Sequence, residues 1–163
     1  MTLKIYAQVI KDALDSQNWK FSCENVAEDE ISFLIKFTLE ESEKIYCKIM
    51  IFESGICDIE VVLPIVCQPE QYMELCYYLT KQNFASRYAT LRLDMRNGEI
   101  NNSYSFDFNQ STTPESFLEL FLRVRDVDDS VMEELNSICN RKTTTGKNSL
   151  NEKQAGGKHK IML

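Results

Sequence analysis

Histidine is nearly absent from this chain of 163 residues, because only His159 is present, four positions before the end. Histidine is the most common general acid or base near neutral pH and a frequent metal ligand. A serine-histidine-aspartate triad or a cysteine-histidine pair therefore cannot form in the body of the chain. We expect no enzyme, no catalytic residue and no cofactor.

Metal-binding patterns are missing as well. The six cysteines form no Cys-x-x-Cys pair, so we expect free thiols in a reducing, cytoplasmic compartment. Acidic residues gather between positions 126 and 134, but Ser130 and Val131 do not fit the ligand and glycine positions of a calcium loop. We predict no bound metal.

Long apolar runs are also absent, and so is an excess of positive charge. No stretch approaches the roughly 18 apolar residues of a membrane span, so we expect no membrane partner. The formal net charge is -7, and residues 1–140 hold 12 Lys and Arg against 24 Asp and Glu. Nucleic-acid binding depends on neutralising phosphates, and this acidic body predicts no such partner.

The end of the chain differs from the rest in composition. Residues 141–163 carry six basic residues against Glu152 alone, and they hold no aromatic side chain. Such a segment cannot bury enough apolar surface to offset the entropy of ordering it. We predict one folded domain over residues 1–139 and a basic, disordered tail over residues 140–163. A further interpretation is that the tail tethers the domain to nucleic acid or to an acidic partner.

Apolar side chains recur with regular periods through the predicted domain. Helical spacing predicts helices over residues 3–16, about 69–82 and about 114–138, the last interrupted at 126–129. Alternation predicts strands over residues 19–24, 31–39, 43–52, 56–63, 89–95 and 100–108. Short connections favour hairpins, so we predict an α+β fold with a mainly antiparallel sheet of about six strands in the order α-β-β-β-β-α-β-β-α.

One connection carries a strong turn signal. Asn97-Gly98 lies between two alternating segments. A type I′ turn needs positive φ at both central residues, and Asn-Gly is the dipeptide that best accepts this conformation. We therefore predict a tight hairpin of this type.

The predicted sheet has apolar residues on both faces. The second face should be polar if it met only water, yet its alternate positions hold Leu34, Tyr46, Met50, Phe52 and Val62. Either the first or last helix covers this face, or it is a surface for self-association or for a partner. We predict that Tyr46, Met50 and Phe52 bind a partner protein segment.

The middle predicted helix shows a similar excess. Met73, Tyr77 and Tyr78 lie outside its inner apolar stripe. Aromatic residues and methionine are enriched in the centres of protein interfaces. We predict that these three residues form the interface of a homodimer.

Several short motifs resemble the YbjN-type domain family, whose fold is shared with type III secretion chaperones. They are Leu63-Pro64, Tyr78-Leu79, Asn83, Leu93-Asp94, Asn97 to Ile100, and Pro114-Glu115. The resemblance implies a small, acidic, cytoplasmic protein without a known catalytic centre. It also implies a regulatory role or, as in the chaperone relatives, dimerisation and binding of partly unfolded client proteins.

Two hypotheses of different classes follow from the sequence. The first is a non-enzymatic protein-binding module, chaperone-like or regulatory, that binds a segment of a partner through an apolar sheet or helix surface. The alternative is an enzyme of unknown substrate that acts through carboxylates or a metal bound by Asp and Glu.

Overall fold

The structure is a computed structural model that describes residues 2–38 and 44–141. In chain order it contains α1 (Leu3–Ser16), β1 (Phe21–Ala27), β2 (Glu30–Thr38), β3 (Lys44–Phe52), β4 (Ile56–Val66), the 3-10 helix η2 (Pro69–Gln71), α2 (Tyr72–Ala85), β5 (Thr90–Leu93), β6 (Glu99–Asp107), α3 (Pro114–Arg125) and α4 (Asp129–Cys139). The predicted fold class and element order are confirmed, with the last helix divided at the predicted interruption. The predicted tail begins at residue 140 and lies almost wholly outside the described residues.

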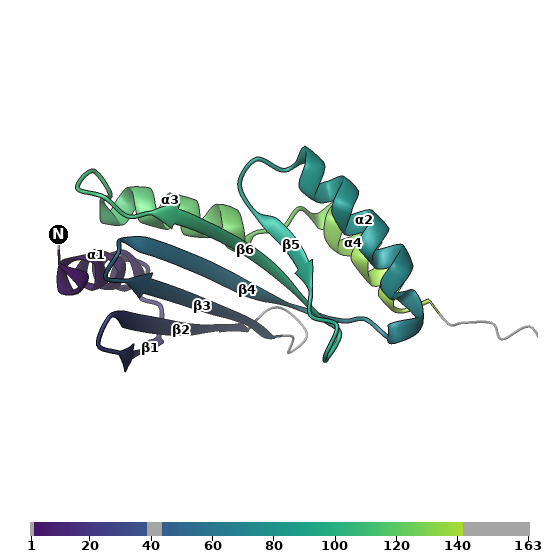
Figure 1. The fold of residues 1–163 in the computed structure, drawn as a ribbon, viewed down its shortest axis with the longest axis horizontal. Helices are drawn as coiled ribbons and strands as arrows, with labels where there is room; N and C mark the ends of the chain where they lie inside the picture. Colours follow the sequence, from purple (N-terminus) through teal and green to yellow (C-terminus); the bar gives the residue numbers. More distant parts are fainter. Residues whose placement is uncertain (1, 39–43, 142–163) are drawn as a thin grey trace, which may run out of the picture.

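The six strands form one antiparallel sheet in the order β1-β2-β3-β4-β6-β5. In Figure 1, α1 and α3 lie behind the sheet, while α2 and α4 lie side by side at its far end. None of the helices in the described part of the chain is long and apolar enough to span a membrane.

The core lies between the sheet and the helices. Phe33, Ile49 and Ile59 stand opposite one another on β2, β3 and β4, and all three side chains are fully buried. Directly opposed residues of antiparallel strands share one face, so these side chains form one apolar surface. The helices cover it with fully buried Ile10, Leu14, Phe117 and Phe121. Each such side chain contributes roughly 1.5–3 kcal/mol by its removal from water.

The hairpin between β5 and β6 differs from the predicted type I′ turn. Gly98 has a positive φ of 78°, but Asn97 does not, and the Gly98 N–H donates to the Asp94 carbonyl at 2.8 Å. The Asp94 carboxylate accepts bonds from the backbone and side chain of Arg96, and these bonds lower the pKa of Asp94 to about 2. The loop is longer than predicted because it is closed by hydrogen bonds to Asp94. Only Gly98, at its end, then takes a left-handed conformation.

The two edges of the sheet are unlike each other. The Asn83 side chain, near the end of α2, accepts a hydrogen bond from the Leu91 N–H at 2.8 Å and donates one to the Leu91 carbonyl at 2.9 Å. A side-chain amide thus takes the place that a further strand would occupy beside β5. At the other edge, none of the described residues pairs with the outer side of β1.

Candidate partner-binding surface

The outer face of the sheet, opposite the helices, carries an apolar cluster made of Leu34, Tyr46 and Val62. Tyr46 stands directly opposite Val62 on the neighbouring strand. Leu34 is 45% exposed and Tyr46 is 49% exposed, whereas Val62 is half-buried. No helix of the described chain covers them, so the predicted alternative of a covering helix is wrong for the described residues.

These side chains line a groove of about 440 Å³, called here the outer groove. Its lining includes Leu34, Lys36, Tyr46, Lys48, Glu60 and Val62. The groove is open to solvent and mainly apolar, with charged groups only at its rim. A surface of this kind suits an apolar side chain of a partner.

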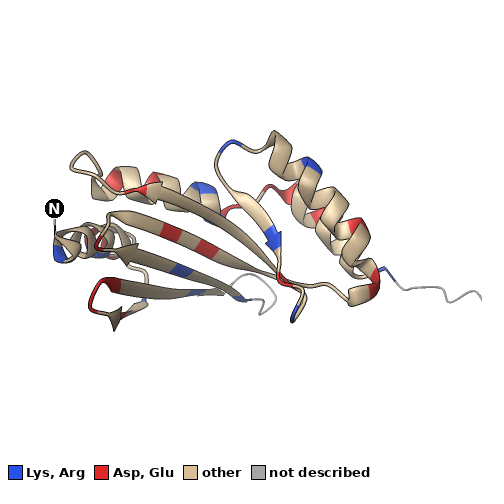
Figure 2. Ribbon diagram, viewed as in Figure 1, with Lys and Arg blue, Asp and Glu red and all other residues tan. Residues whose placement is uncertain are grey.

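The charges at the rim of the outer groove are arranged by strand. Figure 2 shows basic positions on β3 and acidic positions on β4. The amino group of Lys36 lies 5.6 Å from the centre of the Tyr46 ring, a cation–π contact. Among the described residues neither Lys36 nor Lys48 forms an ion pair, although Lys48 stands opposite Glu60. Glu60 instead accepts a hydrogen bond from Asn101 at 2.8 Å.

The predicted partner-binding residues are not all in the outer groove. Tyr46 lines it, but Met50 and Phe52 lie further along β3 and are half-buried. Phe52 lines a separate shallow pocket with Asp29 and Asp58. The strand register therefore groups Tyr46 with Leu34 and Val62. Alternation in the sequence marks both of these residues, whereas the lysines of the rim look like ordinary solvent-facing charges.

The exposed face of α2 is the second apolar surface. Met73 is 84% exposed, Tyr77 is 70% exposed and Phe84 is 95% exposed, and their spacing places them on one stripe of the helix. Tyr78, predicted with them, is half-buried, and both this burial and the negative charge of Glu134 on α4 raise its pKa. The exposed stripe thus contains Phe84 and not Tyr78. Phe84 lies seven residues after Tyr77, a helical spacing that could have predicted this.

The thiols near the outer groove are unsuited to nucleophilic chemistry. The Cys47 side chain is directed into the core, where it is 1% exposed, and burial raises its pKa to about 12. Burial also raises the pKa of Cys57 on the neighbouring strand. Since only the thiolate is a strong nucleophile, neither residue is reactive at neutral pH.

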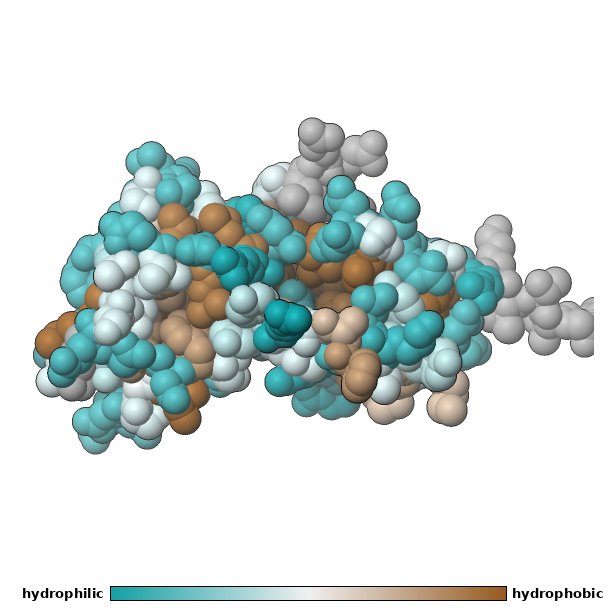
Figure 3. Space-filling model, turned by 90° about the horizontal axis from the view of Figure 1, so that it is seen from above, coloured by the Kyte–Doolittle hydropathy of each residue, from teal (hydrophilic) through white to brown (hydrophobic). Residues whose placement is uncertain are grey.

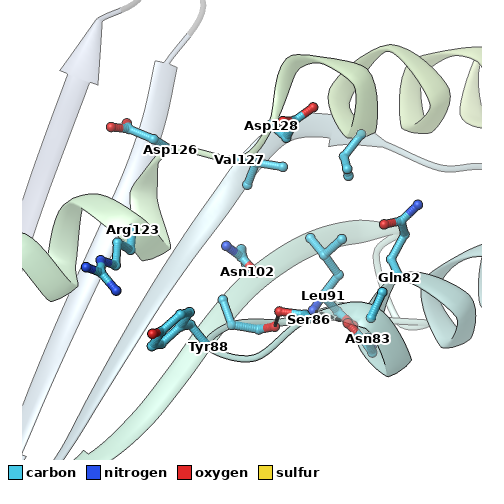
Figure 4. A pocket seen from close by; sticks show the side chains of 13 residues that line it. Gln82, Asn83, Ser86, Tyr88, Leu91, Asn102, Arg123, Asp126, Val127 and Asp128 are labelled. Carbon is cyan, nitrogen blue, oxygen red and sulfur yellow. Dashed lines mark hydrogen bonds between the residues drawn. The ribbon is translucent and has the colours of Figure 1, made fainter.

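A second hollow of about 450 Å³ lies between α2, β6 and the connection from α3 to α4. Seen from above, apolar residues line its floor (Figure 3); in Figure 4 Leu91 and Val127 point into it, while the polar side chains of Gln82, Arg123 and Asp126 lie around it and point outward. Asn102 donates to the Val124 carbonyl at 2.7 Å, while Arg123 pairs with Glu119 and lies 5.0 Å from the centre of the Tyr88 ring. These groups already have structural partners. No cluster of three or more potential metal ligands occurs among the described residues.

Comparison with known proteins adds one finding to this geometry. Neither a protein-family model nor a curated protein matches the chain. Among solved structures, YbjN from E. coli, a proposed transcription regulator, is similar over 79% of this chain and 87% of its own, with a TM-score of 0.53 and 14% sequence identity. The chain has a YbjN-like fold. The resemblance stated from sequence motifs is therefore confirmed for the fold.

Two of the motif residues have structural roles in the YbjN-like fold. Asn83 closes the β5 edge, as described above. Gly98 donates to Asp94 within the hairpin and accepts a hydrogen bond from the Cys67 N–H at 2.9 Å, which ties the hairpin to the chain just after β4. Asn83 and Gly98 therefore stabilise the fold that positions the outer groove and the exposed face of α2.

Proposed function

We propose that the protein is a non-enzymatic binding module that holds a segment of a partner protein in the outer groove. The observation that carries this proposal is the apolar cluster of Leu34, Tyr46 and Val62, which faces solvent on the side of the sheet that the described helices leave open. Contiguous exposed apolar surface of this kind marks interaction sites. The similarity to YbjN, a proposed regulator, supports a binding role.

The experiment compares binding of the full chain to a peptide array that covers apolar, acidic and basic sequences. We expect a subset of peptides to bind, and Tyr46→Glu to abolish that binding, because it places a carboxylate in the apolar part of the groove. Met95→Glu is the matched control, since Met95 is 62% exposed in the β5–β6 hairpin and does not line the outer groove. Binding that survives Tyr46→Glu, or a complete lack of binding, would contradict the proposal.

The proposal also includes a homodimer formed through the exposed stripe of α2. In addition to its apolar residues, this region is acidic near its start, at Glu70, and basic near its end, at Lys81 and Arg87, while Glu74 is already paired with Arg141 at 2.7 Å. Two copies of α2 packed antiparallel would therefore place opposite charges next to each other. Such a two-fold arrangement buries the same surface on both copies.

The alternative of a carboxylate- or metal-dependent enzyme would need a suitable group of carboxylates. Asp29, Glu53 and Asp58 line one shallow pocket, but no group of three or more residues that could hold a metal ion occurs among the described residues. The carboxylate of Asp94 is held by Arg96, and that of Asp126 pairs with Arg125 at 2.6 Å. Each therefore already has a cationic partner. We do not propose this activity.

A further inference from the structure

The charges around the outer groove indicate what kind of segment it accepts; this inference rests on the proposed function. The strand register places Lys36 and Lys48 on the same face as Tyr46, and Lys44 lies at the end of that face beside Thr38. Residues 1–140 are strongly acidic overall. The part of the outer face that holds Lys36, Lys44 and Lys48 is thus basic on an acidic molecule, while Glu30 lies at the other end of the same face, opposite Phe52.

The two lysines at the rim are available for an incoming charge. Neither pairs with a carboxylate among the described residues. Glu60 is the nearest acidic candidate by register, but its carboxylate is engaged by Asn101 on β6. A lysine beside an apolar, partly desolvating surface gains more from a charged partner than one fully in water.

The two sides of the outer groove carry opposite charges, and this difference favours one orientation of a bound segment. Lysines lie on β2 and β3, whereas Asp58 and Glu60 lie on β4. An apolar side chain can occupy the space between Leu34, Tyr46 and Val62. Carboxylates beside it in the partner can then meet Lys36 on β2 and Lys48 on β3, while Glu60, directly opposite Lys48, disfavours by like charge any position nearer β4.

We propose that the occupant of the outer groove is an acidic segment of a partner protein, with a large apolar side chain in the groove and neighbouring carboxylates on Lys36 and Lys48. A nucleic acid does not fit, because the acidic residues of β4 would repel its continuous row of phosphates. A second copy of the chain is a different occupant, and the experiment separates it.

The probe is a short fluorescent peptide in which a central phenylalanine is flanked by glutamates, titrated against the full chain by anisotropy. Two comparison peptides carry lysines in place of the glutamates, or alanine in place of the phenylalanine. We expect the acidic apolar peptide to bind at least about tenfold more tightly than either. We expect its affinity to fall as salt is added, because exposed charges are screened.

The protein variants are Lys36→Glu with Lys48→Glu, and, in case the double reversal perturbs folding, Lys48→Gln alone. We expect about a tenfold loss for the double variant and a smaller loss for Lys48→Gln. Lys4→Glu is the matched control, since Lys4 is exposed on α1 behind the sheet, and it should bind as the unchanged chain does.

The outcomes distinguish this inference from the function on which it rests. If the lysine-flanked peptide binds more tightly and Tyr46→Glu abolishes its binding, the groove is a docking site but the acidic preference is overturned. If no peptide depends on Tyr46, the proposed function itself fails. A labelled single-stranded oligonucleotide that displaces the acidic peptide, or a dimer that the double lysine variant converts to monomer, would also overturn the acidic segment as occupant.

Discussion

Gly98 shows how strongly one residue can depend on the backbone around it. Its φ of 78° lies in the left-handed region, and a Cβ atom at this position would lie 2.2 Å from the Cys67 carbonyl oxygen. The obstacle is backbone, so it cannot rotate away as a side chain could. The same close approach allows the Cys67 N–H to donate to the Gly98 carbonyl.

We therefore expect Gly98→Ala to lower the free energy of unfolding by about 2–4 kcal/mol, because backbone strain and steric displacement act together. Urea denaturation measures the change. Met95→Ala is the control, since Met95 is an exposed residue of the same hairpin and should change stability by no more than about 0.5 kcal/mol. Equal stability of Gly98→Ala and the unchanged chain would contradict the expectation.

At the scale of elements, α2 and β5 depend on each other through Asn83. This residue satisfies both backbone groups of Leu91, and Leu91 is itself buried. The strand is only four residues long, and β6 pairs with its other side. The end of α2 is therefore part of the hydrogen bonding of the sheet.

We expect Asn83→Ala to destabilise the protein by about 1–3 kcal/mol, because it removes the partners of two backbone groups at once. Amide hydrogen exchange at Leu91 should become faster, and urea denaturation should show the loss. Thr80→Ala, an exposed change on the same helix, should have little effect on either measurement. Unchanged exchange at Leu91 would show that the amide pairing contributes nothing.

The elements were predictable from sequence to the extent that their signals are local. Alternation identified the strands, and the acidic break before Ser130 separated α3 from α4. The predicted type I′ turn at Asn97-Gly98 was wrong. The Asp94 carboxylate, three residues before Asn97, accepts hydrogen bonds from Arg96 and makes the loop longer. The rim of the outer groove was also missed. The sequence cannot show that Asn101 engages Glu60, 41 residues away, or that Lys48 forms no ion pair among the described residues.

At the scale of the whole molecule, the predicted homodimer depends on the exposed stripe of α2. Tyr77 lies at the middle of this stripe, 70% exposed in the single chain. We expect Tyr77→Glu to convert a dimer to a monomer, because it would bury two carboxylates near the two-fold axis without a partner charge for either. Size-exclusion chromatography with light scattering measures the mass.

Met95→Glu should leave that mass unchanged, since Met95 is exposed but lies outside α2. If the protein without substitutions is monomeric at tens of micromolar, the predicted homodimer is contradicted. A dimer that persists in Tyr77→Glu would place the contact elsewhere on the molecule.

The unequal sheet edges described above also limit how these molecules can aggregate. Growth of a fibril by strand addition requires each molecule to accept a neighbour on one edge and to present another edge to the next. Here the Asn83 amide and the packing of α2 occupy the β5 side, so that in the described part of the chain only β1 is open. Two molecules that pair through β1 would each use their one open edge, so assembly by strand addition would stop at two molecules.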